Sequence, residues 1–108
     1  MSKPRIWISN KTPQLHEIVR VRALIEHRME SGMRLSSENK PIPRNIVNLF
    51  EVKMDDELLF SWQPETAISQ NPYIEFTFIA RKTGTLHLKW IDDENTVITD
   101  SLELKLNA

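Results

Sequence analysis

Apolar and polar residues alternate along most of this chain with a period of two, the pattern of half-buried β-strands. Between Glu17 and Ile25, for example, Val19, Val21 and Ala23 fall on one side of the segment, with arginines between them. The same alternation predicts strands over residues 5–9, 17–25, 46–54, 58–62, 73–81, 85–91 and 96–106. Strands of this kind bury one face in a common core and leave the other in water.

Turn-forming residues separate the predicted strands. Asp55-Asp56 joins two of them at a spacing typical of a hairpin, and Asn71-Pro72 initiates another turn. Six prolines punctuate the chain too often for a convincing helix to remain. About seven short strands in 108 residues predict an all-β fold, an immunoglobulin-like β-sandwich that forms a single domain over residues 1–108.

The segment from Arg28 to Asn45 interrupts this rhythm and has little strand character. A segment of this length without regular structure is uncommon in a compact domain and often has a function. A long crossover from one sheet of the sandwich to the other explains it equally well. The sequence leaves both interpretations open.

Several apolar residues fall on the side of the predicted strands that should face solvent. If the third, sixth and seventh predicted strands share one sheet, its outer face carries Val47, Leu49 and Ile91. Exposed apolar side chains that lie together mark an interaction surface, whereas scattered ones are ordinary. We predict that this face binds a partner protein, with Met33 and Trp62 as outlying candidates.

Charge and composition narrow the classes of partner. Fourteen Lys and Arg against fifteen Asp and Glu give a net charge of −1, so there is no basic surplus to neutralise nucleic-acid phosphates or to hold an anionic membrane. The longest apolar run is far shorter than the roughly 20 residues of a membrane span. We therefore predict that neither nucleic acid nor a membrane is a partner.

Candidate catalytic and metal-binding residues form no constellation. The chain has no cysteine, and the spacing of His16, His27 and His87 matches no metal motif. His27 with Glu30 is one conceivable acid–base pair, and the run 92–94 (Asp-Asp-Glu) is one conceivable calcium cluster, although acidic residues are also common in tight turns. We predict no catalytic residue, no metal and no cofactor.

A second function class is a stand-alone adhesion or carbohydrate-binding sandwich. Such a module needs exposed aromatic side chains around a concave site. Trp7, Trp62 and Tyr73 are the candidates for that role.

Four short motifs occur in order along the chain: HRMESG from His27, PIPR from Pro41, SQNPY from Ser69 and WIDD from Trp90. Any one of them is a weak signal. Together, with their spacing, they resemble SoxZ, the family of small subunits of the thiosulfate-oxidation carrier complex. The resemblance covers nearly the whole chain.

This resemblance implies an immunoglobulin-like sandwich, which agrees with the strand pattern. It also implies a tight heterodimer with a SoxY-like protein that carries sulfur intermediates on a C-terminal cysteine, and transient docking to enzymes of the sulfur-oxidation cycle. Members of the family have no catalytic residue and no cofactor. They are periplasmic and are exported with the partner's signal, which suits an N-terminus that lacks a secretory leader. We expect the isolated chain to form homo-oligomers, because its docking face would be uncovered.

The sequence departs from the family pattern at three turns. Arg28 stands where the family usually has proline, the glycine before the second strand is replaced around Leu15-His16, and Asn95 replaces the glycine expected after the Asp-Asp turn. Asparagine still tolerates a left-handed backbone. These differences concern loops more than the fold, and they leave open a carrier system for a sulfur compound other than thiosulfate.

Overall fold

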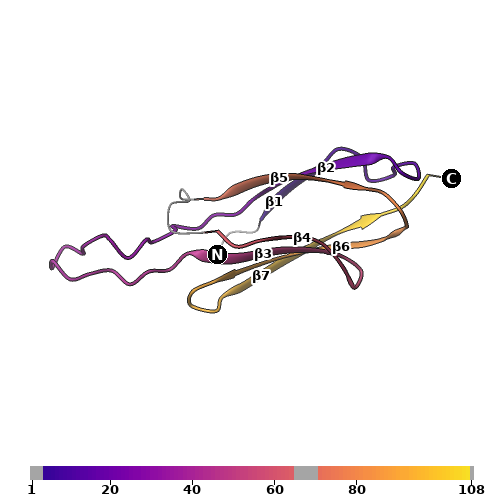
Figure 1. The fold of residues 1–108 in the computed structure, drawn as a ribbon. Helices are drawn as coiled ribbons and strands as arrows, with labels where there is room; N and C mark the ends of the chain where they lie inside the picture. Colours follow the sequence, from indigo (N-terminus) through magenta and orange to yellow (C-terminus); the bar gives the residue numbers. More distant parts are fainter. Residues whose placement is uncertain (1–3, 65–70, 108) are drawn as a thin grey trace.

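The computed structural model describes residues 4–64 and 71–107, and within them the chain forms strands and no helix (Figure 1). The strands are β1 (Arg5–Ile8), β2 (Ile18–Leu24), β3 (Val47–Met54), β4 (Glu57–Trp62), β5 (Tyr73–Ile79), β6 (Gly84–Asp92) and β7 (Val97–Leu104). Each lies within about two residues of a range predicted from the alternation of apolar residues. No helix able to span a membrane occurs in the described part of the chain.

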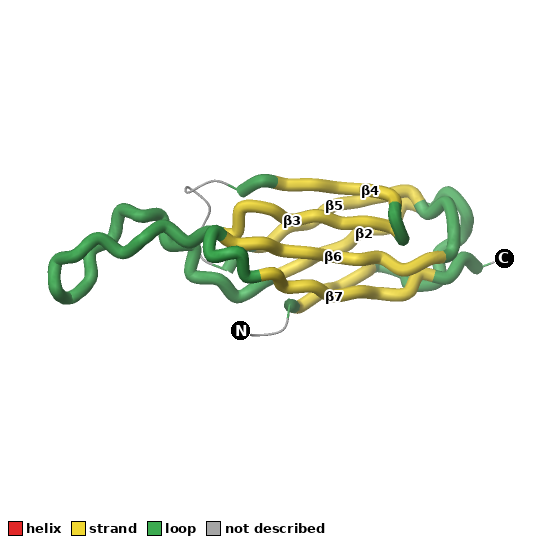
Figure 2. Tube along the Cα trace, turned by 90° about the horizontal axis from the view of Figure 1, so that it is seen from below, coloured by secondary structure: helices red, strands yellow, loops and turns green. Residues whose placement is uncertain are grey.

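The strands form two antiparallel sheets packed face to face. One sheet has the strand order β1-β2-β5 and the other has the order β4-β3-β6-β7. Figure 2 looks onto the four-stranded sheet, with the three-stranded sheet behind it. This arrangement confirms the predicted all-β sandwich.

Alternate residues of the strands fill the space between the sheets. Val21 and Ala23 of β2, Phe50 and Val52 of β3 and Leu88 of β6 are all buried and belong to one hydrophobic cluster. Burying a side chain of this size contributes roughly 1.5–3 kcal/mol, so the cluster is the main source of stability. It joins both sheets into a single core.

Several turns depend on residues with a left-handed backbone. His16 and Asn95 have φ angles of 70° and 63°, and both stand at or beside positions where the sequence lacks the glycine of the SoxZ pattern. His16 is held there because its N–H donates to the carbonyl of Ala80 at 2.6 Å. The left-handed turns therefore survive without glycine, at a cost of about 1–2 kcal/mol for a residue such as histidine.

The segment at residues 28–45, called the arm below, projects from one end of the sandwich (Figures 1 and 2). Its two sides lie antiparallel and are joined by bridges between Glu30 and Asn45 and between Leu35 and Pro41. The arm contributes to an elongated shape of 61 × 21 × 21 Å. It connects β2 of one sheet to β3 of the other, so it is a crossover between the sheets, one of the two interpretations that the sequence left open, and it has the form of a hairpin-like extension.

Val47 does not lie on the outer face of its sheet, and that prediction is wrong. The pairing of β3 with β6 contains a β-bulge: Val47 pairs with Asp92 and Leu49 with Ile91, so Asn48 is an extra residue on β3. A bulge of this kind breaks the strict alternation of side chains. Val47 consequently turns into the core, where it is 1% exposed.

Candidate functional site

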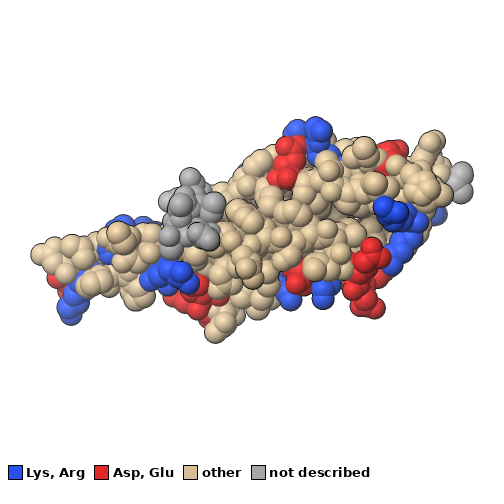
Figure 3. All heavy atoms as spheres, in the orientation of Figure 1, with Lys and Arg blue, Asp and Glu red and all other residues tan. Residues whose placement is uncertain are grey.

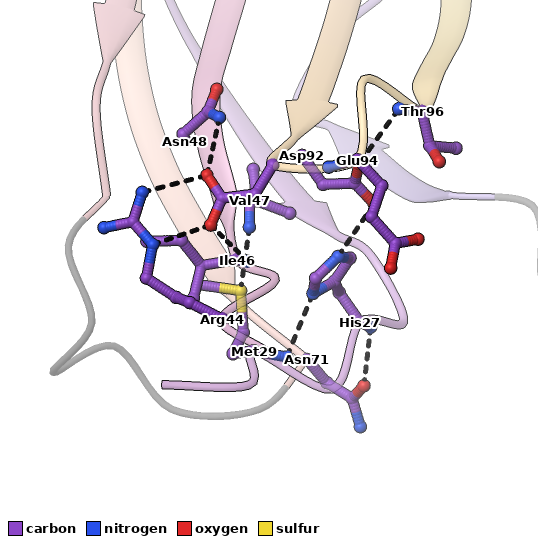
Figure 4. Close-up of polar contacts among 11 residues, drawn as sticks. His27, Met29, Arg44, Ile46, Val47, Asn48, Asn71, Asp92, Glu94 and Thr96 are labelled. Atoms are coloured by element: carbon purple, nitrogen blue, oxygen red, sulfur yellow. Dashed lines mark hydrogen bonds and ion pairs between the residues drawn. The ribbon is translucent and has the colours of Figure 1, made fainter. Parts of the chain in front are cut away.

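The junction between the arm and the sandwich, called the arm base below, gathers polar side chains from four separate segments (Figure 4). His27 and Met29 lead into the arm, Arg44 leads out of it, Asp92 ends β6 and Asp93 begins the turn after it. These residues belong to three of the motifs that resemble SoxZ, and Asn71 of the fourth also contacts His27. Residues 69 and 70 of that fourth motif lie outside the described residues.

His27 is buried and its ring bridges two parts of the arm base. Its Nδ1 accepts the backbone N–H of Met29 at 3.0 Å, and its Nε2 lies 3.2 Å from Oδ2 of Asp92. Because Nδ1 is an acceptor, the proton of the neutral ring sits on Nε2 and is donated to the Asp92 carboxylate. The other oxygen of Asp92 accepts the amides of Glu94 and Thr96 at 3.0 and 2.9 Å.

Met29 has a left-handed backbone with a φ of 55°, which is strained for a residue with a long side chain. Two contacts hold it: its N–H donates to His27, and its sulfur accepts the N–H of Val47 at 3.3 Å. The side chain is buried beside the core. The entry of the chain into the arm is therefore clamped on both sides of a strained residue.

Asp93 closes the opposite side of the arm base. Its carboxylate accepts two hydrogen bonds from the Arg44 guanidinium, at 2.8 and 3.1 Å, one from the amide of Ile46 at 3.2 Å and one from the side chain of Asn48 at 3.0 Å. Burial raises the pKa of Asp93, but the hydrogen bonds from Asn48, Arg44 and Ile46 outweigh it, and the pKa lies below its usual value. The bulge residue Asn48 thus has a role in fixing the arm.

We expect the variant Arg44→Gln to lower the free energy of unfolding by about 1 kcal/mol at pH 6 and by much less at pH 2. A carboxylate whose pKa is depressed by folding stabilises the protein above its unfolded pKa of about 4, and this contribution disappears as the pH falls through the lower folded value. Urea denaturation at several pH values measures the difference. An equal loss at pH 2 and pH 6 would show that Arg44 acts through packing alone.

Glu30, on the arm itself, is paired with arginines. Arg34 donates to both carboxylate oxygens of Glu30, and Nε of Arg28 lies 3.3 Å from Oε1 of Glu30. The hydrogen bond from Arg34 is the largest cause that lowers the pKa of Glu30; partial burial opposes it, and the charges of Arg34 and Arg28 add to it. The conceivable acid–base pair of His27 and Glu30 is therefore not assembled, because His27 binds Asp92 and Glu30 binds arginines.

The other candidates for chemistry are dispersed. His16 and His87 are exposed, in a turn and on the outer side of β6. Asp92 and Asp93 accept hydrogen bonds from histidine, arginine, asparagine and backbone donors. Within the described residues, no group of three or more His, Asp or Glu side chains is arranged to hold a metal ion.

The structure places the predicted partner-binding residues in different surroundings. Leu49 and Ile91 are opposite one another on β3 and β6 and are half-buried. Met33 is 87% exposed on the arm, and Trp62 of β4 is half-buried against the core. With Val47 inside, the predicted outer patch is reduced to the Leu49–Ile91 pair.

The three candidate aromatic residues for a carbohydrate site do not form one platform. Trp7 and Tyr73 line a shallow pocket of about 270 Å³ on the outside of the three-stranded sheet. Trp62 belongs to the other sheet. Ile18 and Ile79, which were not among the predicted site residues, are exposed on the sheet that carries Trp7. Their signal was present, because each falls out of phase with the buried residues of its strand.

The comparison with family models decides the assignment. The model described as "SoxZ: Sulphur oxidation protein SoxZ" matches residues 8–103, nearly the whole chain. This chain belongs to the SoxZ family. Among curated proteins, no significant sequence match was found.

Solved structures resemble this SoxZ-family chain in fold. A superoxide reductase (neelaredoxin) from Ignicoccus hospitalis superposes with a TM-score of 0.73 at 13% identity, covering 98% of this chain and 81% of the reductase. The sulfur carrier protein SoxY from Chlorobium limicola f thiosulfatophilum superposes with a TM-score of 0.67 at 9% identity, covering 100% of this chain and 82% of SoxY. At these identities the likeness concerns the sandwich fold alone.

Membership of the SoxZ family assigns the chain to the carrier complex of sulfur oxidation. The arm base is where the sequence motifs that resemble the family come together. The motifs that carried the resemblance are far apart in sequence, yet they meet at this one junction and hold the arm in place. Their side chains bind one another and backbone groups, and these contacts hold the arm against the sandwich.

Proposed function

We propose that this chain is the non-catalytic subunit of a sulfur-carrier heterodimer. It binds a SoxY-like subunit, whose C-terminal cysteine carries the sulfur intermediates, and helps to present that carrier to the enzymes that oxidise thiosulfate or a related sulfur compound. The observation that carries the proposal is the family match over residues 8–103.

Two features of the chain support a binding role. The buried ionisable side chains of the arm base are committed to one another and to backbone groups, so they serve as structural anchors. The chain also has no cysteine. A second thiol close to a persulfide carrier would divert the sulfur by thiol exchange, so a thiol-free partner protects the intermediate.

The proposal includes the compartment. A carrier of this kind works in the periplasm, and this subunit would reach it bound to its partner and exported by the partner's signal. Folding and assembly would then precede export, which requires a stable interface. Interfaces of that class bury about 1,200–2,000 Å² in total.

Co-expression with the SoxY-like subunit of the same genome tests the proposal. The two chains should co-elute as one complex with a Kd below about 1 µM, and a Cys→Ser variant of the carrier tail should bind equally well, because the thiol is not part of the interface. The isolated chain should leave thiosulfate unchanged. Separate elution of the two subunits at about 50 µM each, a concentration well above such a Kd, would refute the proposal.

A further inference from the structure

Exposed large apolar side chains concentrate on one part of the molecule. Among the described residues nine such side chains are exposed, and five of them lie on the three-stranded sheet or at the sandwich edge beside it. These five are Trp7 of β1, Ile18 of β2, Tyr73 and Ile79 of β5, and Leu58 of β4. Exposed large apolar side chains that cluster in this way are typical of an interface.

Strand pairing brings four of the five onto the outer face of the three-stranded sheet, called the β1–β2–β5 face below. Ile18 pairs directly with Ile79, which makes one apolar end of the face. At the other end, Trp7 and Tyr73 line the shallow pocket together with Leu24. Ile18 is 69% exposed, and its neighbour Val19 is fully buried, so the outward direction of Ile18 follows from the phase of β2.

The apolar end of this face continues around the edge of the sandwich. Among the described strands β4 and β5 are each at the edge of a sheet, and a groove of about 600 Å³ runs between them. Ile18 and Ile79 line the groove from one sheet and Leu58 from the other. Figure 3 shows uncharged side chains across the middle of the sandwich, over β4 and β5.

The charge of the face differs in sign from that of the whole chain. Its outward positions carry Arg5, Arg20 and Arg22 against a single carboxylate, Glu75. Arg20 and Arg22 share that carboxylate at 3.5 and 3.2 Å. The face is thus positive, whereas the chain as a whole has a charge of −1.

The residue types match those that dominate binding energy at interfaces. Tryptophan, tyrosine and arginine are the residues most enriched in interface hot spots. Here the Arg22 guanidinium lies 4.6 Å from the centre of the Trp7 ring, so the aromatic and cationic groups form a cation–π pair. A partner that covered it would present apolar side chains and an excess of carboxylates.

We propose that the β1–β2–β5 face, with the adjoining groove, is the surface that docks the carrier subunit, through a carrier face that is apolar and rich in carboxylates. This inference rests on the proposed function, since it names the surface by which that function is carried out. It replaces the Leu49–Ile91 face expected from the sequence.

The test compares substitutions at two exposed apolar positions. Ile18→Glu introduces a charge where the face meets the groove, and Val97→Glu introduces one on β7, where Val97 is 55% exposed, pairs with Ile91 and lies outside the proposed surface. Affinity for the SoxY-like subunit is measured by calorimetry. We expect Ile18→Glu to weaken binding about 100-fold or more and Val97→Glu to change it less than about 3-fold. Thermal melts of both variants confirm that each is folded.

Reversing a charge on the face is a second, independent test of the docking surface. Arg20→Glu should weaken binding and reduce its dependence on salt, because exposed interface charges steer association. If the wild-type chain binds the SoxY-like subunit and both Ile18→Glu and Arg20→Glu bind it equally tightly, the docking surface is wrong and the proposed function stands. Loss of self-association in Ile18→Glu with unchanged partner binding would also overturn it, since a second copy would then be the occupant. Absence of wild-type binding would instead refute the proposed function.

Discussion

Replacing Asp92 by alanine is expected to lower the free energy of unfolding by about 3–4 kcal/mol. The Asp92 side chain is almost fully buried and accepts hydrogen bonds from His27, from the amide of Glu94 and from the amide of Thr96. Alanine leaves all three donors without their acceptor, two of them in the turn after β6. Each buried donor that loses its partner costs about 1–3 kcal/mol. Chemical denaturation followed by tryptophan fluorescence measures the loss.

The same substitution should loosen the arm. His27 would lose the contact that orients its ring, and Met29 would then be held in its left-handed conformation by its remaining contacts alone. Hydrogen exchange of the Glu30 and Asn45 amides, which pair across the foot of the arm, reports this directly. Faster exchange there with unchanged exchange in β2 is the expected pattern.

Asp92→Asn is the matched control for the role of the carboxylate. The amide has the same shape, and its oxygen still accepts from Glu94 and Thr96, but its NH₂ group then faces the Nε2–H of His27. We expect a loss smaller than that of alanine, together with a change in the histidine tautomer visible by NMR. A stability equal to wild type in both variants would contradict the assigned hydrogen bonds.

Phe50→Ala is expected to cost about 3–5 kcal/mol, enough to unfold a large part of the population of a small domain. Phe50 is fully buried at the centre of the core. Its ring lies 4.8 Å from that of Trp90, 6.1 Å from that of Phe60 and 6.2 Å from that of Phe76, measured between ring centres. Because these neighbours come from both sheets, the cavity cannot close by a small shift of one strand.

Phe50→Leu serves as its control. Leucine keeps most of the buried volume, and a swap of similar volume usually costs less than about 1.5 kcal/mol. The urea midpoint measures both variants. If both variants were as stable as the wild type, the packing of Phe50 between the two sheets would be contradicted.

The alternation of apolar residues was sufficient to predict the strands, because a side-chain period of two leaves one phase in which each strand buries its apolar set. Val19, Val21 and Ala23 of β2 are all buried as expected, and Ile18 faces out as the same phase requires. The turn at Asp55-Asp56 was equally predictable, since local sequence determines a tight hairpin.

The prediction for Val47 was wrong because a bulge is a property of two paired strands. Nothing in the residues around Val47 shows that Asn48 will be the extra residue opposite β6. Asn48 is stabilised in that position by its hydrogen bond to Asp93, which is 45 residues away in sequence. A periodicity argument reads one strand at a time and cannot detect such a shift.

At the arm base, too, the sequence predicted some features and only the folded structure showed the others. The motifs around His27 and Asp92 were visible as sequence signals, but their roles were not, because 65 residues separate the two side chains that meet at 3.2 Å. The candidate pair of His27 and Glu30 was plausible by proximity in sequence alone. In the folded chain the left-handed residue Met29 lies between them, and His27 and Glu30 bind different partners.

By itself, the sequence determined the class of fold, the strands with their buried faces, the hairpin turns and the family of this protein, since all of these follow from local pattern. Only the tertiary structure decided which exposed apolar residues lie together. Ile18 and Ile79 become neighbours because β2 pairs with β5, and Leu58 joins them across the edge of the sandwich. The reason is physical: burial is largely dictated within each strand, whereas a surface is assembled from strands that are distant in sequence and are brought side by side by pairing alone.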